Sequence, residues 1–146
     1  MSSPFFQFKQ FRIYHDLCAM KVNTDGILLG AWANSTGKRR ILDIGTGSGL
    51  IALMLAQRTI ENRSEVTAVD LDSDAATQAK YNAERSPWAD RVRVVQKDIL
   101  EFESRGEKFD LLVCNPPYFV DSLKSPDQKR RLARHTDSLD FNKLLQ

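Results

Sequence analysis

Short apolar segments alternate with segments of helical length from about residue 40 onward, and this alternation restricts the possible folds more than any other feature. The apolar segments predict four strands, over residues 40–44, 66–70, 92–95 and 109–114. Helical patterns over residues 50–58 and 73–85 separate the first three, and Pro87 ends the second helix. Strands that alternate with helices form right-handed βαβ units and a parallel sheet. Because the strands are nearly all apolar, we predict an α/β, Rossmann-like fold whose mostly parallel sheet carries helices on both faces.

The first 36 residues precede this alternation, and we treat residues 1–36 as an N-terminal strand and helix extension. Residues 5–14 alternate imperfectly between apolar and polar side chains, which predicts a strand or a short hairpin. Residues 27–32 predict a short helix. The expected helix caps are the polar residues at the helix starts, Thr24 or Asp25 and Ser73 or Asp74. Residues 37–146 are expected to be the N-terminal part of one larger α/β domain.

The composition is that of an ordinary globular protein: 146 residues with 21 Lys and Arg, 19 Asp and Glu, and a net charge of +2. The densest basic cluster spans residues 129–135 (KRRLARH), which suits a phosphate backbone, although a solvated helix face has the same pattern. No apolar stretch is long enough for a membrane span, and no leader peptide is evident. Cys18 and Cys114 form no metal or redox motif. We therefore expect a cytoplasmic protein with no membrane partner and no metal.

Three glycines lie between the first predicted strand and the next helix, in residues 43–49 (DIGTGSG). Glycines permit a tight turn and close approach of a ligand, and the helix N-terminus offers free N–H groups. The G-x-G-x-G spacing differs from the G-x-G-x-x-G of dinucleotide-binding turns. The carboxylate of Asp43 would repel a pyrophosphate but attract a cationic amino group. A turn that only lets the helix pack on the strand remains the alternative.

Two further acidic residues follow predicted strands. Asp70 ends the second strand, where a carboxylate can accept hydrogen bonds from both hydroxyls of a ribose. Asp98 lies just past the third strand, where it can accept a hydrogen bond from the exocyclic amine of a purine. A helix cap for Asp70 and an ordinary loop acid for Asp98 are the alternatives.

Residues 115–118 (NPPY) follow the fourth predicted strand directly and give the most specific signal in the chain. The two prolines fix the backbone and donate no hydrogen bonds, which leaves the Pro116 carbonyl and the Asn115 side-chain carbonyl free to converge. Two converging acceptors suit a planar NH2 group, and Tyr118 offers a face on which a planar ring stacks. A rigid turn is the alternative. All these motifs follow strand ends, which is the edge where open α/β sheets bind ligands.

Together these segments resemble the class I methyltransferases that use S-adenosylmethionine. Residues 43–49 with Asp70 and Asp98 are similar to their cofactor site, and residues 115–118 to the motif of enzymes that methylate adenine, guanine or glutamine nitrogens. The chain is further similar, over about residues 8–145, to the bacterial tRNA(Val) adenine-N6 methyltransferases, which modify the adenine 3′ of the anticodon. The stretches that carry this similarity are residues 8–11 (FKQF), 15–16 (HD), 18–22 (CAMKV), 24–32 (TDGILLGAW), 53–58 (LMLAQR) and 86–89 (SPWA).

The resemblance implies roles for individual residues, with S-adenosylmethionine as cofactor and tRNA as partner. The expected cofactor-binding residues are Lys21, Thr24, Asp25, Asp43, Gly45, Gly47, Gly49, Asp70, Asp98 and Asn115. The expected catalytic residues, which hold the target base, are Asn115, Pro116 and Tyr118. The residues expected to contact tRNA phosphates are Arg130, Arg131 and Arg134. Catalysis is expected to rely on alignment and electrostatics, without a metal, and the intact enzyme is expected to be a monomer.

Other interpretations stay open. A nicotinamide-dependent oxidoreductase shares the broad fold, but the glycine spacing and residues 115–118 argue against it. A methyltransferase that acts on an rRNA base or a protein glutamine amide shares the central motifs, whereas residues 21–25 favour the tRNA enzyme. A non-catalytic cofactor-binding fragment is the last alternative. The sheet of the family continues beyond its fourth strand, and we expect this chain to be truncated after that strand.

Overall fold

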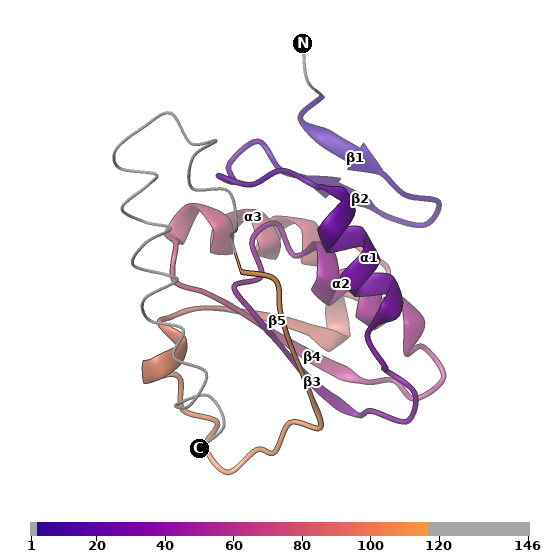
Figure 1. The fold of residues 1–146 in the computed structure, drawn as a ribbon, viewed down its shortest axis with the longest axis vertical. Coiled ribbons are helices and arrows are strands. Elements are labelled where there is room, and N and C mark those ends of the chain that lie inside the picture. Colours follow the sequence, from indigo (N-terminus) through magenta and orange to yellow (C-terminus); the bar gives the residue numbers. More distant parts are fainter. Residues whose placement is uncertain (1–2, 117–146) are drawn as a thin grey trace.

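Four parallel strands form the centre of residues 3–116, the part of the chain that this computed structural model describes (Figure 1). The strand order is β5–β4–β3–β6. Their bounds are Arg40–Ile44 for β3, Glu65–Asp70 for β4, Val92–Gln96 for β5 and Leu111–Cys114 for β6. Ile44 pairs with both Val69 and Cys114, so the carboxyl ends of the strands lie together at one edge. The predicted α/β fold with a mostly parallel sheet is confirmed.

Three α-helices pack on one face of this sheet: α1 (Thr24–Trp32), α2 (Leu50–Arg58) and α3 (Ser73–Glu84). The two connections β3–α2–β4 and β4–α3–β5 step across the sheet in the same direction, and right-handed crossovers then place both helices on the same side. All three helices contribute to one apolar cluster with strand residues such as Ile41 and Val66. The other face of the strands carries Leu42, Ile44 and Val69. They are covered by the chain around the 3-10 turn η2 (Ile99–Glu101).

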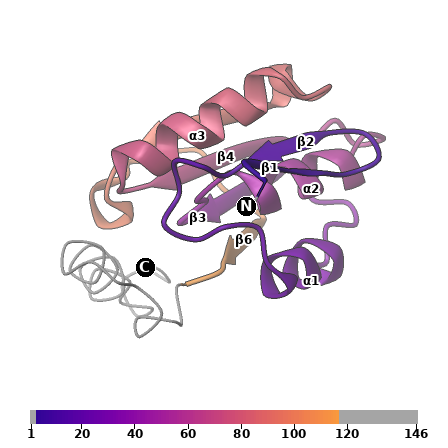
Figure 2. The same cartoon turned by 90° about the horizontal axis from the view of Figure 1, so that it is seen from above.

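The N-terminal segment forms an antiparallel hairpin, β1 (Phe5–Gln7) and β2 (Arg12–Tyr14), which is the second of the two predicted arrangements, a strand or a short hairpin. The hairpin lies on the helix side of the sheet, close to α2 and α3 (Figure 2). Phe11 and Ile13 are buried in the main apolar cluster, and the Phe11 and Trp88 rings pack in a T-shaped arrangement at a centroid distance of 5.3 Å. The extension therefore packs into the same core as the sheet.

The structure corrects both predicted helix caps. Asn23 caps α1, with Oδ1 accepting the Gly26 N–H at 2.9 Å, and Asp72 caps α3 by accepting the Ala75 N–H at 3.2 Å. An N-cap has extended backbone angles and a side chain that reaches the N–H three residues later. Asn23 and Asp72 meet both conditions, so the predicted caps Thr24 or Asp25 and Ser73 or Asp74 lie inside the first turns.

The last described strand is two residues shorter than predicted, and Asp110, directly before it, bonds to the start of β3. Its carboxylate accepts the N–H groups of Arg39 and Arg40, each at 2.9 Å, just where β3 begins. Phe109 packs instead into the second apolar cluster. Strand pairing therefore starts at Leu111.

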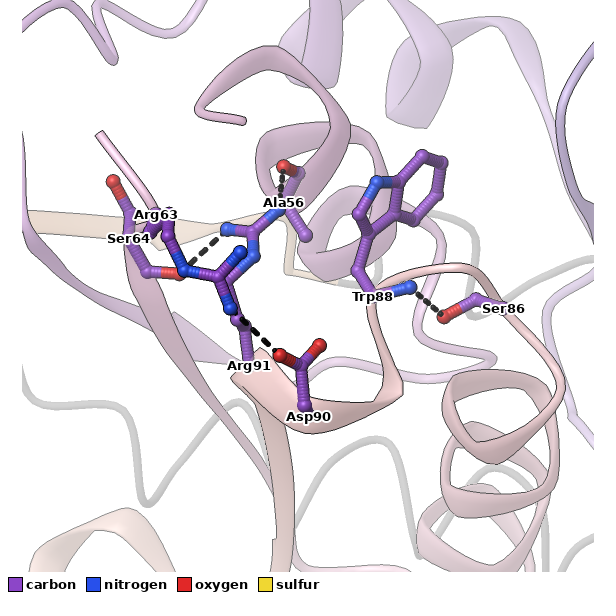
Figure 3. Close-up of polar contacts among 7 residues, drawn as sticks. All are labelled: Ala56, Arg63, Ser64, Ser86, Trp88, Asp90 and Arg91. Atoms are coloured by element: carbon purple, nitrogen blue, oxygen red, sulfur yellow. Dashed lines mark hydrogen bonds and ion pairs between the residues drawn. The ribbon is translucent and has the colours of Figure 1, made fainter. Parts of the chain in front are cut away.

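A buried guanidinium holds the connections at the opposite edge of the sheet (Figure 3). Arg91, in the 3-10 turn η1 (Ala89–Arg91), donates hydrogen bonds to the carbonyl of Ser64 at 2.7 Å and to that of Ala56 at 2.6 Å. These bonds join the end of α2, the start of β4 and the chain that leads into β5. Nearby, the exposed side chains of Arg63 and Asp90 form an ion pair at 2.9 Å.

Candidate functional site

The carboxyl ends of β3, β4 and β5, together with the chain after β6, open into a cavity of about 390 Å³. Its sheet side consists of the glycine-rich loop from Gly45 to Ser48, the turn from Asp70 to Ser73, Gln96 and Asn115. Its other side consists of residues 18–23 and Gly26, which belong to the N-terminal extension. The cavity therefore lies where parallel α/β sheets bind ligands, and the extension forms part of its wall.

The glycine-rich loop has backbone conformations that favour glycine. Gly45, Gly47 and Gly49 have φ values of 69°, 58° and 88°. Gly49 also lies against α3, because a Cβ atom on it would stand 3.3 Å from the Cβ of Ala79. Gly45 and Gly47 line the cavity, whereas Gly49 is the N-cap of α2 and lies behind the wall.

The N–H groups of this loop are largely engaged within the protein. Gly45 and Thr46 donate to the Val69 carbonyl at 2.8 and 3.0 Å, and Gly49 donates to the Thr46 carbonyl at 2.9 Å. The Gly47 N–H donates to Asp70 Oδ2 at 2.8 Å. A loop that binds a pyrophosphate presents its N–H groups to the ligand instead. The loop therefore shapes the wall of the cavity, which argues further against a dinucleotide.

Asp70 lies on the cavity wall and is 8% exposed. Its Oδ1 accepts the Asp72 N–H at 2.9 Å while Oδ2 accepts the Gly47 N–H. These two bonds fix the orientation of the carboxylate on the wall. Asp70 is therefore one of the predicted residues that the structure places on the cavity wall.

Asp43 lies beneath the glycine-rich loop and does not line the cavity. It is 1% exposed, and its Oδ2 accepts the Thr46 hydroxyl at 2.7 Å. Burial raises the pKa of Asp43 to about 7, with a further increase from the charge of Asp70, while the Thr46 hydroxyl and the Ala52 backbone oppose the shift. The structure thus places this carboxyl where it supports the loop from below.

The remaining predicted cofactor residues occupy different positions. Lys21 lines the cavity, whereas Thr24 and Asp25 are exposed in the first turn of α1 and do not line it. Asp98 lies in a separate small crevice, which it shares with Gly45 and Asp70, and its Oδ1 accepts the Leu100 N–H at 3.0 Å.

Asn115 brings the chain after β6 to the cavity, and it faces the extension. A Cβ atom on Gly26 would lie 3.5 Å from Asn115 Nδ2 and 3.0 Å from Leu50 Cδ2, so the absence of a side chain at Gly26 lets α1 approach both. Pro116 follows Asn115 but is not among the residues lining the cavity. Four predicted residues, Tyr118, Arg130, Arg131 and Arg134, lie outside the described residues.

The cavity also contains residues that the sequence did not single out, notably Cys18, Asn23, Gly26 and Gln96. An Asn directly before a helical pattern is a cap signal, so Asn23 was within reach of sequence rules. The other three carry no such local signal. Burial raises the pKa of Cys18 to about 12, and the negative charges of Asp70, Asp72 and Asp16 add to the shift. The positive charge of Lys21 opposes the shift, so acidic and basic side chains both lie near Cys18.

Residues 3–116 lack two further structural features. Within this part of the chain, no three His, Cys, Asp or Glu side chains are grouped so that they could bind a metal ion. No helix there has the length and apolar character that crossing a membrane requires.

Comparison with known proteins agrees with the geometry of the site. The model of the methyltransferase small domain family matches residues 21–139. The tRNA1(Val) (adenine(37)-N6)-methyltransferases of Bacteroides thetaiotaomicron and Phocaeicola vulgatus are 61% and 58% identical to the chain. Each match covers 99% of this chain but 60% of the relative, so the chain spans about three fifths of the length of these relatives.

A solved structure shows the same fold. The S-adenosylmethionine-dependent methyltransferase of Thiobacillus denitrificans, in complex with S-adenosyl-L-homocysteine, is 24% identical with a TM-score of 0.54. The match covers 80% of this chain and 47% of that one. The fold, the family match over most of the sequence and the high identity to curated methyltransferases agree, and the chain belongs to the methyltransferase small domain family.

Proposed function

We propose that this chain is the cofactor-binding part of an enzyme that transfers a methyl group from S-adenosylmethionine to the N6 amine of the adenine next to the anticodon of tRNA(Val). The cavity that joins the glycine-rich loop, Asp70 and Asn115 carries the proposal. The names of the curated relatives, at up to 61% identity, support the tRNA substrate. In this proposal residues 1–36 are an extension, residues 37–146 are the N-terminal part of the methyltransferase domain, and the intact enzyme is a cytoplasmic monomer.

The residues present fit S-adenosylmethionine. The acidic residues Asp70 and Asp72 line the cavity, where their charges would attract a sulfonium and an ammonium group. Asp70 would accept the ribose hydroxyls, and Asp98, in the adjoining crevice, would accept the adenine amine. Gly45, Gly47 and Lys21 would border the methionine part. Asp43 and Gly49 would act from behind the wall, and Thr24 and Asp25 from the first turn of α1.

The bound cofactor would supply a methyl group activated by a positively charged sulfur. Asn115 Oδ1 and the Pro116 carbonyl would accept the two hydrogens of the target amine and hold its nitrogen in line with that methyl group. Tyr118 would stack on the base, which must leave its own stack to enter the site. Because the acceptors favour a pyramidal nitrogen, its lone pair becomes available for attack on the methyl carbon. The carbon–sulfur bond would break as the nitrogen–carbon bond forms, and the methylated amine would release one proton to water. The rate enhancement would then come from alignment and electrostatics.

Methyl transfer tests the proposal directly. We would complete the chain with the part of the Bacteroides thetaiotaomicron relative that it does not match, and assay this protein beside the 146-residue chain. The substrates are tRNA(Val) that lacks the modification, ribosomal RNA and a glutamine peptide. Transfer to N6 of the tRNA adenine is the expected result. Transfer only to rRNA or only to glutamine would show that the proposed tRNA substrate is wrong. Absence of S-adenosylmethionine binding would show that the proposed cofactor is wrong.

The role of Asn115 has its own variant. Asn115→Ala in the completed protein should abolish transfer while S-adenosylhomocysteine still binds, because the amide would act on the target amine. Asn34→Ala is the matched control, since Asn34 is exposed and does not line the cavity. Unchanged turnover in Asn115→Ala would remove Asn115 from the catalytic residues.

The basic cluster is tested by salt dependence. Replacing Arg130 and Arg131 by Ala should weaken tRNA binding and reduce the slope of log K against log salt by about one to two, because fewer phosphate contacts are made. The double variant of Lys38 and Arg39 removes the same charge before β3, at the far edge of the sheet, and should leave the slope unchanged. Equal slopes in the two variants would exclude Arg130 and Arg131 from the interface.

A further inference from the structure

His15 joins two segments of the N-terminal extension through both nitrogens of its ring. Nε2 lies 3.0 Å from the Ser3 carbonyl oxygen, and Nδ1 accepts the Val22 N–H at 3.0 Å. The ring is 7% exposed. Since a carbonyl only accepts and the Val22 N–H only donates, this network assigns the proton to Nε2 and leaves Nδ1 as the acceptor. The neutral ring with this tautomer is the form that makes both bonds.

The segment around His15 is itself fixed to α3 by two buried amides. Asn82 accepts the Tyr14 N–H at 2.9 Å and donates to the Tyr14 carbonyl at 2.8 Å and the Ser48 carbonyl at 2.7 Å. Gln78, one turn earlier, accepts the Leu17 N–H at 2.9 Å. These side chains are 1% and 3% exposed, so their bonds are shielded from water. The backbone on both sides of His15 is therefore anchored to the core.

The bond to Val22 transmits this anchoring to the cavity wall. Residues 18–23 line the cavity, and they begin one residue after Leu17, which Gln78 fixes. Val22 lies near the other end of this wall, immediately before the Asn23 cap of α1. Gln78 and His15 thus hold the wall segment near its two ends. The His15 bond fixes the end that precedes Gly26, the residue that lies next to Asn115.

We propose that His15 is a positioning residue for the cofactor cavity, and that its Nδ1 holds Val22 so that residues 18–23 close the cavity against the bound cofactor. The inference rests on the proposed function, because the ligand is S-adenosylmethionine or its demethylated product. His15 does not line the cavity and acts through the backbone of Val22. Loss of the bond should therefore reduce cofactor affinity more than it reduces the stability of the core.

Two substitutions separate the two ring nitrogens. In His15→Asn, Oδ1 takes the place of Nδ1 and can still accept the Val22 N–H, while the contact with Ser3 is lost. In His15→Gln, Nε2 takes the place of the ring Nε2 and can still donate to Ser3, while the acceptor for Val22 is lost. Dissociation constants for S-adenosylhomocysteine, measured by calorimetry on the full chain, should rise about tenfold in His15→Gln and less than about threefold in His15→Asn.

Two further measurements test the role of His15 without the ligand, and the second of them needs no variant. Hydrogen exchange at the Val22 amide of the ligand-free protein should accelerate in His15→Gln and stay slow in His15→Asn. In the wild type, ring 15N shifts should report a protonated Nε2 and an unprotonated Nδ1. Equal affinities in the two variants, equal exchange at Val22, or a protonated Nδ1 would each overturn the role of His15. Failure of the wild type to bind S-adenosylhomocysteine would overturn the proposed function instead, and the exchange experiment would still decide whether His15 positions Val22.

Discussion

The carboxylate of Asp70 accepts the backbone N–H of Gly47 at 2.8 Å, which ties the end of β4 directly to the loop that follows β3. The second oxygen of the same carboxylate accepts the Asp72 N–H and so fixes the turn that leads into α3. One side chain therefore sets the relative position of two parts of the cavity wall. A ligand that bonds to Asp70 would meet a group that is already oriented.

Asp70→Asn should weaken both the loop and the proposed cofactor site. The amide has a single oxygen, which can accept the N–H of Gly47 or that of Asp72 but not both. Its NH2 group then faces the other N–H. We expect a loss of about 1–2 kcal/mol in the free energy of unfolding, and at least a tenfold weaker affinity for S-adenosylhomocysteine. Urea denaturation and calorimetry measure the two effects.

Asp72→Asn is the matched control for this substitution. Asp72 lines the same cavity, but its side chain caps α3, and Asn is an equally good N-cap. Its free energy of unfolding should change by less than about 0.5 kcal/mol. If Asp72→Asn were as unstable as Asp70→Asn, the bond to Gly47 would not be the cause.

Two glycines of the loop should respond differently to alanine. Gly47 has a φ of 58°, and a Cβ atom there would meet nothing within 4 Å. Gly49 has a φ of 88°, and its Cβ would press on Ala79 of α3. Gly47→Ala should therefore cost about 1–2 kcal/mol, from backbone conformation alone. Gly49→Ala should cost more, about 2–4 kcal/mol, because the helix must also shift.

Urea denaturation of the two alanine variants measures these costs. Equal values would show that contact with α3 is not important at Gly49. A gain in stability for Gly47→Ala would contradict the left-handed conformation of that residue, because alanine is favoured only where φ is negative.

The strands of the sheet and the helices that cover it were predictable, because each has a local pattern of apolar residues in the sequence. Residues 50–58, for example, predict a helix, and α2 spans Leu50–Arg58. The caps were predicted wrongly, because several residues able to cap stand in a row, as in Asn23, Thr24 and Asp25. Which of them takes the extended backbone depends on how the preceding segment packs. Here Val22, directly before Asn23, is held by His15.

Much of the cavity could not be predicted, because its wall depends on contacts between distant residues. Asn82 bonds to Tyr14, 68 positions away, and reads in the sequence as an ordinary polar helix residue. Gly26 and Asn115 lie next to each other in the cavity wall, yet each belongs to a different local pattern. Asp43 differs from these residues, because the sequence motif that contains it was evident. Its position beneath the loop, however, is known only from the structure.

Replacement of Arg91 should destabilise the protein far more than replacement of Arg63. The Arg91 guanidinium is buried and donates to the carbonyls of Ser64 and Ala56, which Arg91→Met would leave without this donor (Figure 3). We expect a loss of about 2–4 kcal/mol. Arg63→Met breaks an exposed ion pair with Asp90 and should cost less than about 1 kcal/mol. Comparable losses in urea denaturation would contradict a structural role for Arg91.

The stability of the protein should depend on the protonation of Asp43. Burial raises the pKa of this carboxyl from 3.8 to about 7 in the folded state, so the fold favours the protonated form. Below about pH 4 the carboxyl is protonated in both states and carries no penalty. As pH rises from about 4 to about 7, only the unfolded state ionises, and the free energy of unfolding falls by up to about 4 kcal/mol. Asp43→Asn has no carboxyl group at this position and lacks this dependence. As pH rises from about 4 to about 7, the stability of the wild type should therefore fall relative to that of the variant.

Asp110 is the control for the pH dependence, because its folded pKa is displaced in the opposite direction. Burial raises the pKa of Asp110, but the N–H groups of Arg39 and Arg40 outweigh this effect and bring it below the ordinary value. Its contribution to stability is present above about pH 4 and is lost as the pH falls further. Between pH 5 and pH 8 the difference between wild type and Asp110→Asn should therefore stay constant, while that for Asp43→Asn changes. Urea denaturation at intervals of half a pH unit measures both differences, and a constant difference for Asp43→Asn would mean that this carboxyl is ionised in the fold throughout.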